Sequence, residues 1–165
     1  GEVSLRYAEV SGRLEGIARH DRPRGPIETL EHVSVTRELG VRGDLRGAIR
    51  PGKSGRRQIS LIEAESWDAA LADLKLSADQ LLPWHVRRAN LLVNGIRLPR
   101  EAGKIIAIGK SLRIETTCEC DPCSRMDQIL PGLKLALMPD WRGGVLGRVL
   151  TDGEIAIGDE VRIEE

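Results

Sequence analysis

Apolar and polar residues alternate in several short runs along the chain, which is the period-two pattern of β-strands. The runs end at glycine, proline or other turn-forming residues and cover residues 3–7, 30–35, 59–61, 91–93, 105–108, 112–118, 145–150, 154–155 and 161–163. Many short strands with few helices predict a mostly β fold, a closed or nearly closed antiparallel barrel, because closure removes exposed sheet edges.

Two glycine-containing dipeptides predict turns between these strands. Asn94-Gly95 separates the apolar run 91–93 from a second run at 96–98, and this dipeptide accepts the positive φ of a tight turn. The pattern predicts a β-hairpin formed by these two runs. Gly109-Lys110 predicts a similar turn before residues 112–118.

Only one stretch shows clear helical periodicity. Apolar side chains recur there at spacings of three and four, at Ala64, Trp67, Leu71 and Leu74. They predict an amphipathic helix over about residues 63–75 that packs across one face of the barrel. Ser77, followed three residues later by Gln80, resembles a capping box for a further short turn.

Composition narrows the class of protein. The chain has 165 residues, no Phe and one Tyr, so a core of Val, Ile, Leu and Ala around three Trp is expected, in a single domain spanning residues 1–165. Its 25 basic residues balance 25 acidic ones, which gives no overall field toward nucleic acid or an anionic membrane. No apolar run reaches the length of a membrane span, and a cytoplasmic location is expected.

The three cysteines lie close together, at positions 118, 120 and 123, which suits thiol chemistry in a reducing compartment. Asp121-Pro122 predicts a helix start, with Asp121 as the cap and Pro122 at the first helical position. Cys123 then takes the second position, where free backbone N–H groups and nearby Arg125 stabilise a thiolate. The pattern predicts that Cys123 is a nucleophile.

Other interpretations of the cysteines stay open at this level. All three can be inert buried hydrophobes. The spacing C-x-C-x2-C can hold zinc if His20, His32 or His85 supplies a fourth ligand. A Cys-His hydrolase needs a base near Cys123, which a linear sequence does not show.

Five landmarks around the cysteines resemble one family. They occur in order as the loop Gly40–Asp44, the R-Q strand at 57–62, R-A-N-L at 88–91, the cysteine motif at 117–127, and C-terminal strands with Gly153 and Gly158-Asp159. Together they resemble the MOSC domain, the module at the C-terminus of molybdenum-cofactor sulfurases that also occurs as stand-alone proteins. The resemblance covers about residues 25–163. Leu45-Arg46 stands where relatives often carry a His shortly after the Asp.

This resemblance implies a β-barrel in which Cys123 carries a persulfide sulfur or ligates molybdenum, with Cys120 as an assisting thiol and Arg125 beside them. It implies contacts to molybdopterin from Arg57, Arg88, Asn90, Gly43 and Asp44. The implied partners are a sulfur donor, such as a cysteine desulfurase, and a molybdoenzyme or its cofactor as acceptor. Neither nucleic acid nor a membrane is an expected partner.

Residues 40–57 form the longest stretch without a regular pattern, and they are rich in glycine and arginine. Within them, residues 47–54 match the phosphate-loop formula G-x-x-x-x-G-K-S, but no strand precedes the match and no helix follows it, so a nucleotide hydrolase is not predicted. The local positive charge suits a phosphorylated pterin. The alternative from another class is a non-catalytic module that binds an anion or zinc and has structural cysteines.

Overall fold

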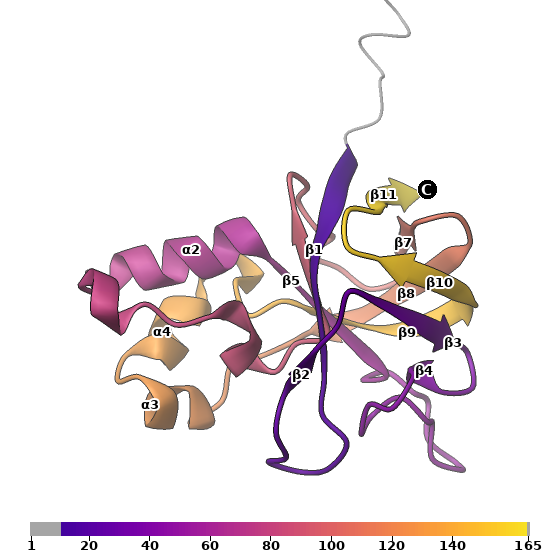
Figure 1. Ribbon diagram of the computed structural model, residues 1–165, viewed down its shortest axis with the longest axis horizontal. Helices are drawn as coiled ribbons and strands as arrows, with labels where there is room; N and C mark the ends of the chain where they lie inside the picture. The colour runs from indigo at the N-terminus through magenta and orange to yellow at the C-terminus, as the bar shows by residue number, and fades with distance from the viewer. Residues whose placement is uncertain (1–10, 165) are drawn as a thin grey trace, which may run out of the picture.

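Seven strands close into a β-barrel (Figure 1). The computed structural model describes residues 11–164, so the strand predicted at 3–7 lies outside the described residues. In hydrogen-bonded order the barrel strands are β11 (Glu160–Glu164), β7 (Ile105–Ile108), β8 (Leu112–Glu119), β9 (Val145–Thr151), β5 (Ile59–Glu63), β6 (Leu91–Asn94) and β1 (Ser11–Arg19), and β1 pairs with β11 to close the ring. The predicted mostly β, closed-barrel class is confirmed.

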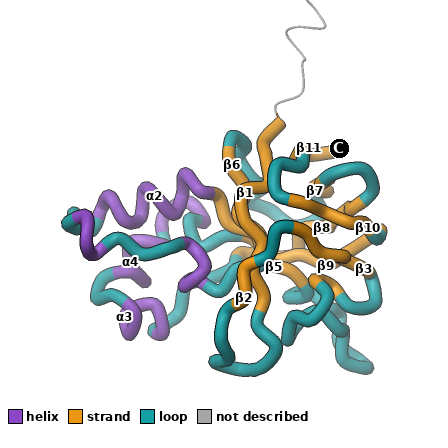
Figure 2. The backbone as a smooth tube through the Cα atoms, viewed as in Figure 1, coloured by secondary structure: helices purple, strands orange, loops and turns teal. Residues whose placement is uncertain are grey.

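The other elements decorate this barrel. The short strand β2 (Glu28–Thr29) extends β1, and a small separate sheet contains β10 (Gly153–Ala156), β3 (His32–Thr36) and β4 (Gly40–Val41). Three helices gather on one side of the barrel (Figure 2), namely α2 (Ala64–Asp73), α3 (Arg125–Ile129) and α4 (Leu133–Leu137). Three 3₁₀ turns complete the described elements: η1 (Ala78–Gln80), η2 (Trp84–Arg87) and η3 (Pro139–Trp141).

The parallel pair β5 and β6 separates two hydrophobic clusters. Leu61 and Leu91 belong to the cluster inside the barrel, whereas Ile62 and Leu92 belong to the cluster under the helices. Both faces of these strands are therefore covered, which explains their continuous apolar runs. The helix predicted over 63–75 is confirmed as α2, which buries Trp67 in the second cluster.

The hairpin predicted at Asn94-Gly95 is wrong. Gly95 has the expected positive φ of 75°, but residues 96–98 form no strand. β6 pairs instead with β1 and β5, so both of its edges are already occupied. Carboxylates hold the chain that follows, because Glu65 accepts the N–H of Gly95 at 2.9 Å and Glu63 accepts the N–H of Leu98 at 2.7 Å.

Glu63 is a buried carboxylate at the junction of β5 and α2. It accepts hydrogen bonds from the Arg100 guanidinium, the Leu98 N–H and the Ser66 hydroxyl. Burial alone would raise the pKa of Glu63, but these hydrogen bonds outweigh burial and lower its pKa below the ordinary 4.5. A carboxylate with a lowered folded-state pKa stabilises the fold above its unfolded pKa, and this stabilisation is lost as the pH falls through the folded value.

We expect Glu63→Gln to destabilise the protein at pH 7 by about 3 kcal/mol, because the change leaves the buried Arg100 guanidinium without its counter-charge. Urea unfolding measured at several pH values should also show a smaller acid-induced loss of stability in this variant than in the wild type. Glu101→Gln is the matched control, since the Glu101 side chain is exposed and its ion pair with Lys104, at 3.8 Å, is exposed as well. Identical pH profiles for wild type and Glu63→Gln would contradict the expectation.

Candidate functional site

Two of the three cysteines line one cavity of about 400 Å³, here called the cysteine cavity. Its wall includes most of the residues that the sequence singled out: Asp44, Arg57, Arg88, Asn90, Cys120, Cys123 and Arg125. The Cys123 residue is exposed and Cys120 is half-buried, so a solute in this cavity can reach sulfur. Cys118 is half-buried and does not line this cavity.

The predicted helix start at Pro122 is wrong. Helix α3 begins at Arg125, with Ser124 as its N-cap residue, and Asp121 makes no capping bond. Cys123 therefore precedes the helix, and its carbonyl accepts the Met126 N–H at 2.9 Å. The chain stays irregular through residues 121–123 because Cys120 is still tied to the strand region, where its N–H donates to the Gly144 carbonyl at 2.9 Å.

Arg87 makes the most direct polar contact to a cysteine in this cavity. Its Nη2 donates to the Cys120 carbonyl at 2.8 Å and lies 3.3 Å from the Cys120 Sγ. The Arg87 side chain is buried, and its Nε has no hydrogen-bond partner among the described residues. A buried cation beside sulfur favours an anion at this place.

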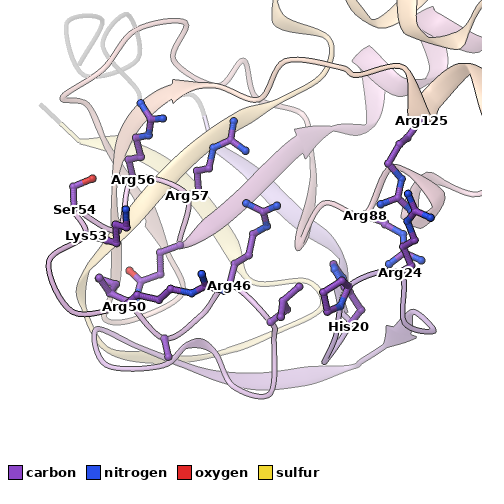
Figure 3. A pocket seen from close by; sticks show the side chains of 16 residues that line it. His20, Arg24, Arg46, Arg50, Lys53, Ser54, Arg56, Arg57, Arg88 and Arg125 are labelled. Carbon is purple, nitrogen blue, oxygen red and sulfur yellow. The ribbon is translucent and has the colours of Figure 1, made fainter.

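A second cavity of about 530 Å³, the basic cavity, adjoins the first. The two share His20, Arg46, Arg57, Arg88 and Arg125. Its wall carries eight cationic side chains (Figure 3): Arg24, Arg46, Arg50, Lys53, Arg56, Arg57, Arg88 and Arg125. Within residues 11–164, no acidic side chain lines it. This charge favours an anionic ligand, since a cleft lined by one sign of charge concentrates the opposite sign.

Several of these cations have spare hydrogen-bond donors. The guanidinium groups of Arg46, Arg57 and Arg125 meet no acceptor within the part of the chain that the structure describes. Arg88 donates one bond to the Gly25 carbonyl at 2.9 Å, while its Nη1 is buried without a partner. Burial and the charge of Arg125 lower the pKa of Arg88. The negative charge of an anion that enters would oppose both causes and favour the charged form of Arg88.

Two predicted ligand contacts have a structural task as well. Asp44 accepts the backbone N–H groups of His20 and Arg46, each at 3.2 Å, and so shapes the loop between the cavities. Asn90 links two barrel strands, because its Oδ1 accepts the Ser60 N–H at 3.0 Å and its Nδ2 donates to the Ala18 carbonyl at 3.2 Å. Both residues still line the cysteine cavity.

Gly43 lies outside both cavities. It has a φ of +85°, and a Cβ there would lie 3.1 Å from the Arg19 guanidinium. Its role is to let the chain turn beside Arg19. Gln58, from the R-Q pair, also has a structural role. Its Nε2 donates to the Gly47 carbonyl and its Oε1 accepts the Val149 N–H, so it anchors the arginine-rich loop within residues 40–57 to β9.

Sequence reasoning missed two residues of the site. His20, which was considered only as a possible fourth zinc ligand, lines both cavities, and its Nδ1 lies 4.0 Å from Asp44. Burial lowers the pKa of His20, and Asp44 opposes this shift. His20 thus stands beside Asp44, while Leu45-Arg46 occupies the place where relatives often carry a His. Arg87 was overlooked in favour of its neighbour Arg88.

The competing interpretations of the motifs find no support in the geometry. Within residues 11–164, no three His, Cys, Asp or Glu side chains converge as a metal site would require. Residues 47–54 form an irregular loop that leads into β5, without the helix that a phosphate loop needs. No described helix is long and apolar enough to cross a membrane.

By its fold and site the chain is a closed β-barrel protein with two cysteines beside a cationic cavity. The particular family follows from comparison of the sequence with family models. The MOSC domain model matches residues 33–162, and the chain belongs to this family. A comparison with functionally curated proteins gave no significant match.

Solved structures show the same fold. The YuaD protein of Bacillus subtilis is 19% identical, with a TM-score of 0.74 over 93% of this chain and 95% of that one. YiiM from Escherichia coli is 15% identical, with a TM-score of 0.65 over 93% of this chain and 70% of that one. YiiM from Geobacillus stearothermophilus is 16% identical, with a TM-score of 0.58 over 95% and 75%. At these identities the likeness concerns the fold.

Proposed function

We propose that Cys123 carries a persulfide sulfur for molybdenum-cofactor chemistry and that the basic cavity binds the phosphorylated end of the cofactor. The observation that supports the proposal is that the two cavities adjoin and share wall residues, so an exposed cysteine lies beside cations with spare hydrogen-bond donors. The partners we propose are a cysteine desulfurase or similar donor and a molybdoenzyme or its cofactor as acceptor.

The residues present fit a phosphorylated pterin. The buried, unpartnered donors of Arg87 and Arg88 call for an anionic partner, and Arg57 and Arg125 can grip a phosphate through their forked N–H groups. The combined space is in the range of small-molecule sites. When bound, the cofactor would supply a metal centre that accepts sulfur.

The chemistry of loading is a thiolate exchange. The Cys123 thiolate attacks the outer sulfur of a persulfide on the donor, the donor's S–S bond breaks, and the donor cysteine leaves as a thiolate. Cys123 then holds one additional sulfur atom. Cations in the adjoining wall stabilise the anionic groups on both sides of this step.

Two other functions use the same geometry. Cys123 can instead ligate molybdenum through its sulfur, in which case purified protein should contain stoichiometric molybdenum. The basic cavity can also act as an anion-binding module without sulfur chemistry, which its acid-free wall favours. Elemental analysis and anion titration separate these outcomes from sulfur carriage.

Incubation with a persulfide donor should add one sulfur atom to the wild-type protein in intact-mass spectra. We expect Cys123→Ser to lose this gain almost completely, because serine cannot form a persulfide. Cys118→Ser should retain it, since Cys118 lies outside the cavity. An equal gain in Cys123→Ser, or no gain in both the wild type and Cys120→Ser, would refute the sulfur-carrier proposal.

A further inference from the structure

Cys120 and Cys123 are separated by only two residues and line the same cavity. We propose that Cys120 is a resolving thiol that discharges the persulfide of Cys123 as hydrosulfide, and that Arg87 is its positioning residue. This inference rests on the proposed persulfide at Cys123. It assigns the protein a sulfide-releasing activity besides sulfur carriage.

Cys120 is held in place from several sides. Its N–H donates to the Gly144 carbonyl at 2.9 Å, and both its carbonyl and its sulfur contact Nη2 of Arg87. Gly143 allows this close packing, because a Cβ there would lie 2.6 Å from the Cys120 carbonyl oxygen. A thiol fixed in this way loses little additional freedom when it attacks a neighbour.

Cys123 has the opposite character. It is exposed, and its sulfur meets no hydrogen-bond partner within residues 11–164. It can therefore meet an external donor, whereas the anchored Cys120 is less accessible. The exposed thiol is then the one that the donor loads, and the anchored thiol is its resolving partner in the C-x-x-C pair.

The step balances without an external oxidant. The Cys120 thiolate, stabilised by the Arg87 guanidinium, attacks the Sγ of the Cys123 persulfide. The bond to the outer sulfur breaks, and that sulfur leaves with the electron pair as hydrosulfide, while a Cys120–Cys123 disulfide forms. The cations of the cavity wall stabilise the departing anion. A low-molecular-weight thiol then reduces the disulfide, and the thiol is oxidised in turn.

The test follows the loaded protein after the persulfide donor is removed. The wild type should lose the added sulfur and release an equimolar amount of sulfide. As the disulfide forms, its mass should fall to two hydrogens below that of the protein before loading. Cys120→Ser should keep its persulfide at least about tenfold longer than the wild type and should release sulfide correspondingly more slowly. Cys118→Ser should behave as wild type, because Cys118 lies outside the cavity.

Arg87 is tested through the rate of discharge. We expect Arg87→Gln to load sulfur to the same extent but to discharge it about tenfold more slowly, because the charge beside Cys120 is lost. Arg87→Lys retains the charge and should recover part of the rate, which a purely structural role would not produce. Equal discharge rates in wild type, Cys120→Ser and Arg87→Gln would overturn the inference while leaving the sulfur carrier intact.

A second measurement separates the inference from the proposed function. In the Cys118→Ser background, an aromatic disulfide reagent should label Cys123 and release one aromatic thiol, after which Cys120 should displace the second. With Cys120→Ser added, the mixed disulfide should persist and the second release should be absent. If the protein releases the second aromatic thiol but never gains sulfur from the donor, Cys120 does resolve a mixed disulfide on Cys123, and only the carrier proposal fails. A mixed disulfide that persists with Cys120 present would overturn the pair.

Discussion

Arg57→Ala should weaken the binding of pyrophosphate about tenfold to a hundredfold. The Arg57 guanidinium has no acceptor within residues 11–164 and faces the space shared by both cavities. A charge-assisted hydrogen bond contributes about 1.5–3 kcal/mol, and each 1.4 kcal/mol changes affinity about tenfold. Isothermal titration calorimetry measures the change directly. Repeating the titration at higher salt should weaken wild-type binding and reduce the difference between the proteins.

Arg13→Ala is the matched control for this experiment. Arg13 is an exposed arginine on β1 that lines neither cavity, so its loss removes the same formal charge without touching the site. Both variants should unfold at the wild-type temperature because both side chains are exposed. If the two variants bind pyrophosphate equally well, the basic cavity is not an anion site, and the proposed seat of the phosphorylated cofactor loses its support.

The division of charge between the cavities gives the proposed site a direction. Sulfur is confined to one end, where Cys120 and Cys123 lie, and the cations without protein partners continue into the basic cavity. A ligand with an anionic tail and a sulfur-accepting head would therefore enter in one orientation. Arg57, Arg88 and Arg125 line both cavities and would contact such a ligand between its two ends.

Much of the barrel could be predicted because its strands either alternate, as β8 does, or are short apolar runs that end at turn residues, as β6 and β7 are. The strand that was missed, β1, contains glycines at positions 12 and 16 that break the pattern. Both are required by close packing, since a Cβ at Gly16 would lie 2.6 Å from the Trp84 ring. The false hairpin at Asn94-Gly95 also results from contacts between residues that are distant in the chain. Local turn chemistry cannot show that β1 and β5 occupy both edges of β6.

The site was predictable where neighbouring residues form a motif. Cys120, Cys123 and Arg125 lie within six positions, and the structure brings them to one cavity. The backbone and side chain of His20 contact the Asp44 carboxylate from 24 positions away, a pairing that only the folded chain creates. The helix start was misplaced because tertiary bonds to Cys120 outweigh the local preference of Asp121-Pro122.

Gly144→Ala should cause the largest loss of stability among the changes considered. Gly144 has a φ of +106°, and a Cβ there would lie 2.3 Å from the Leu61 carbonyl oxygen. Strain of this kind and a clash with backbone each cost about 1–3 kcal/mol, so a total of about 4 kcal/mol is expected. For a chain of this length, that corresponds to a fall in Tm of about 8–16 °C, measurable by calorimetry.

Gly103→Ala separates the two causes. Gly103 has a similar φ of +85°, but a Cβ there meets nothing within 4 Å, so only the backbone strain of about 1–2 kcal/mol is expected. The additional loss in Gly144→Ala then measures the contact with β5. Because the Gly144 carbonyl accepts the Cys120 N–H, moving this segment should also loosen Cys120 and expose its thiol to alkylation. Equal falls in Tm for the two variants would mean that β5 moves away from the added Cβ at little energetic cost, and that Gly144 does not hold Cys120 rigidly against Arg87.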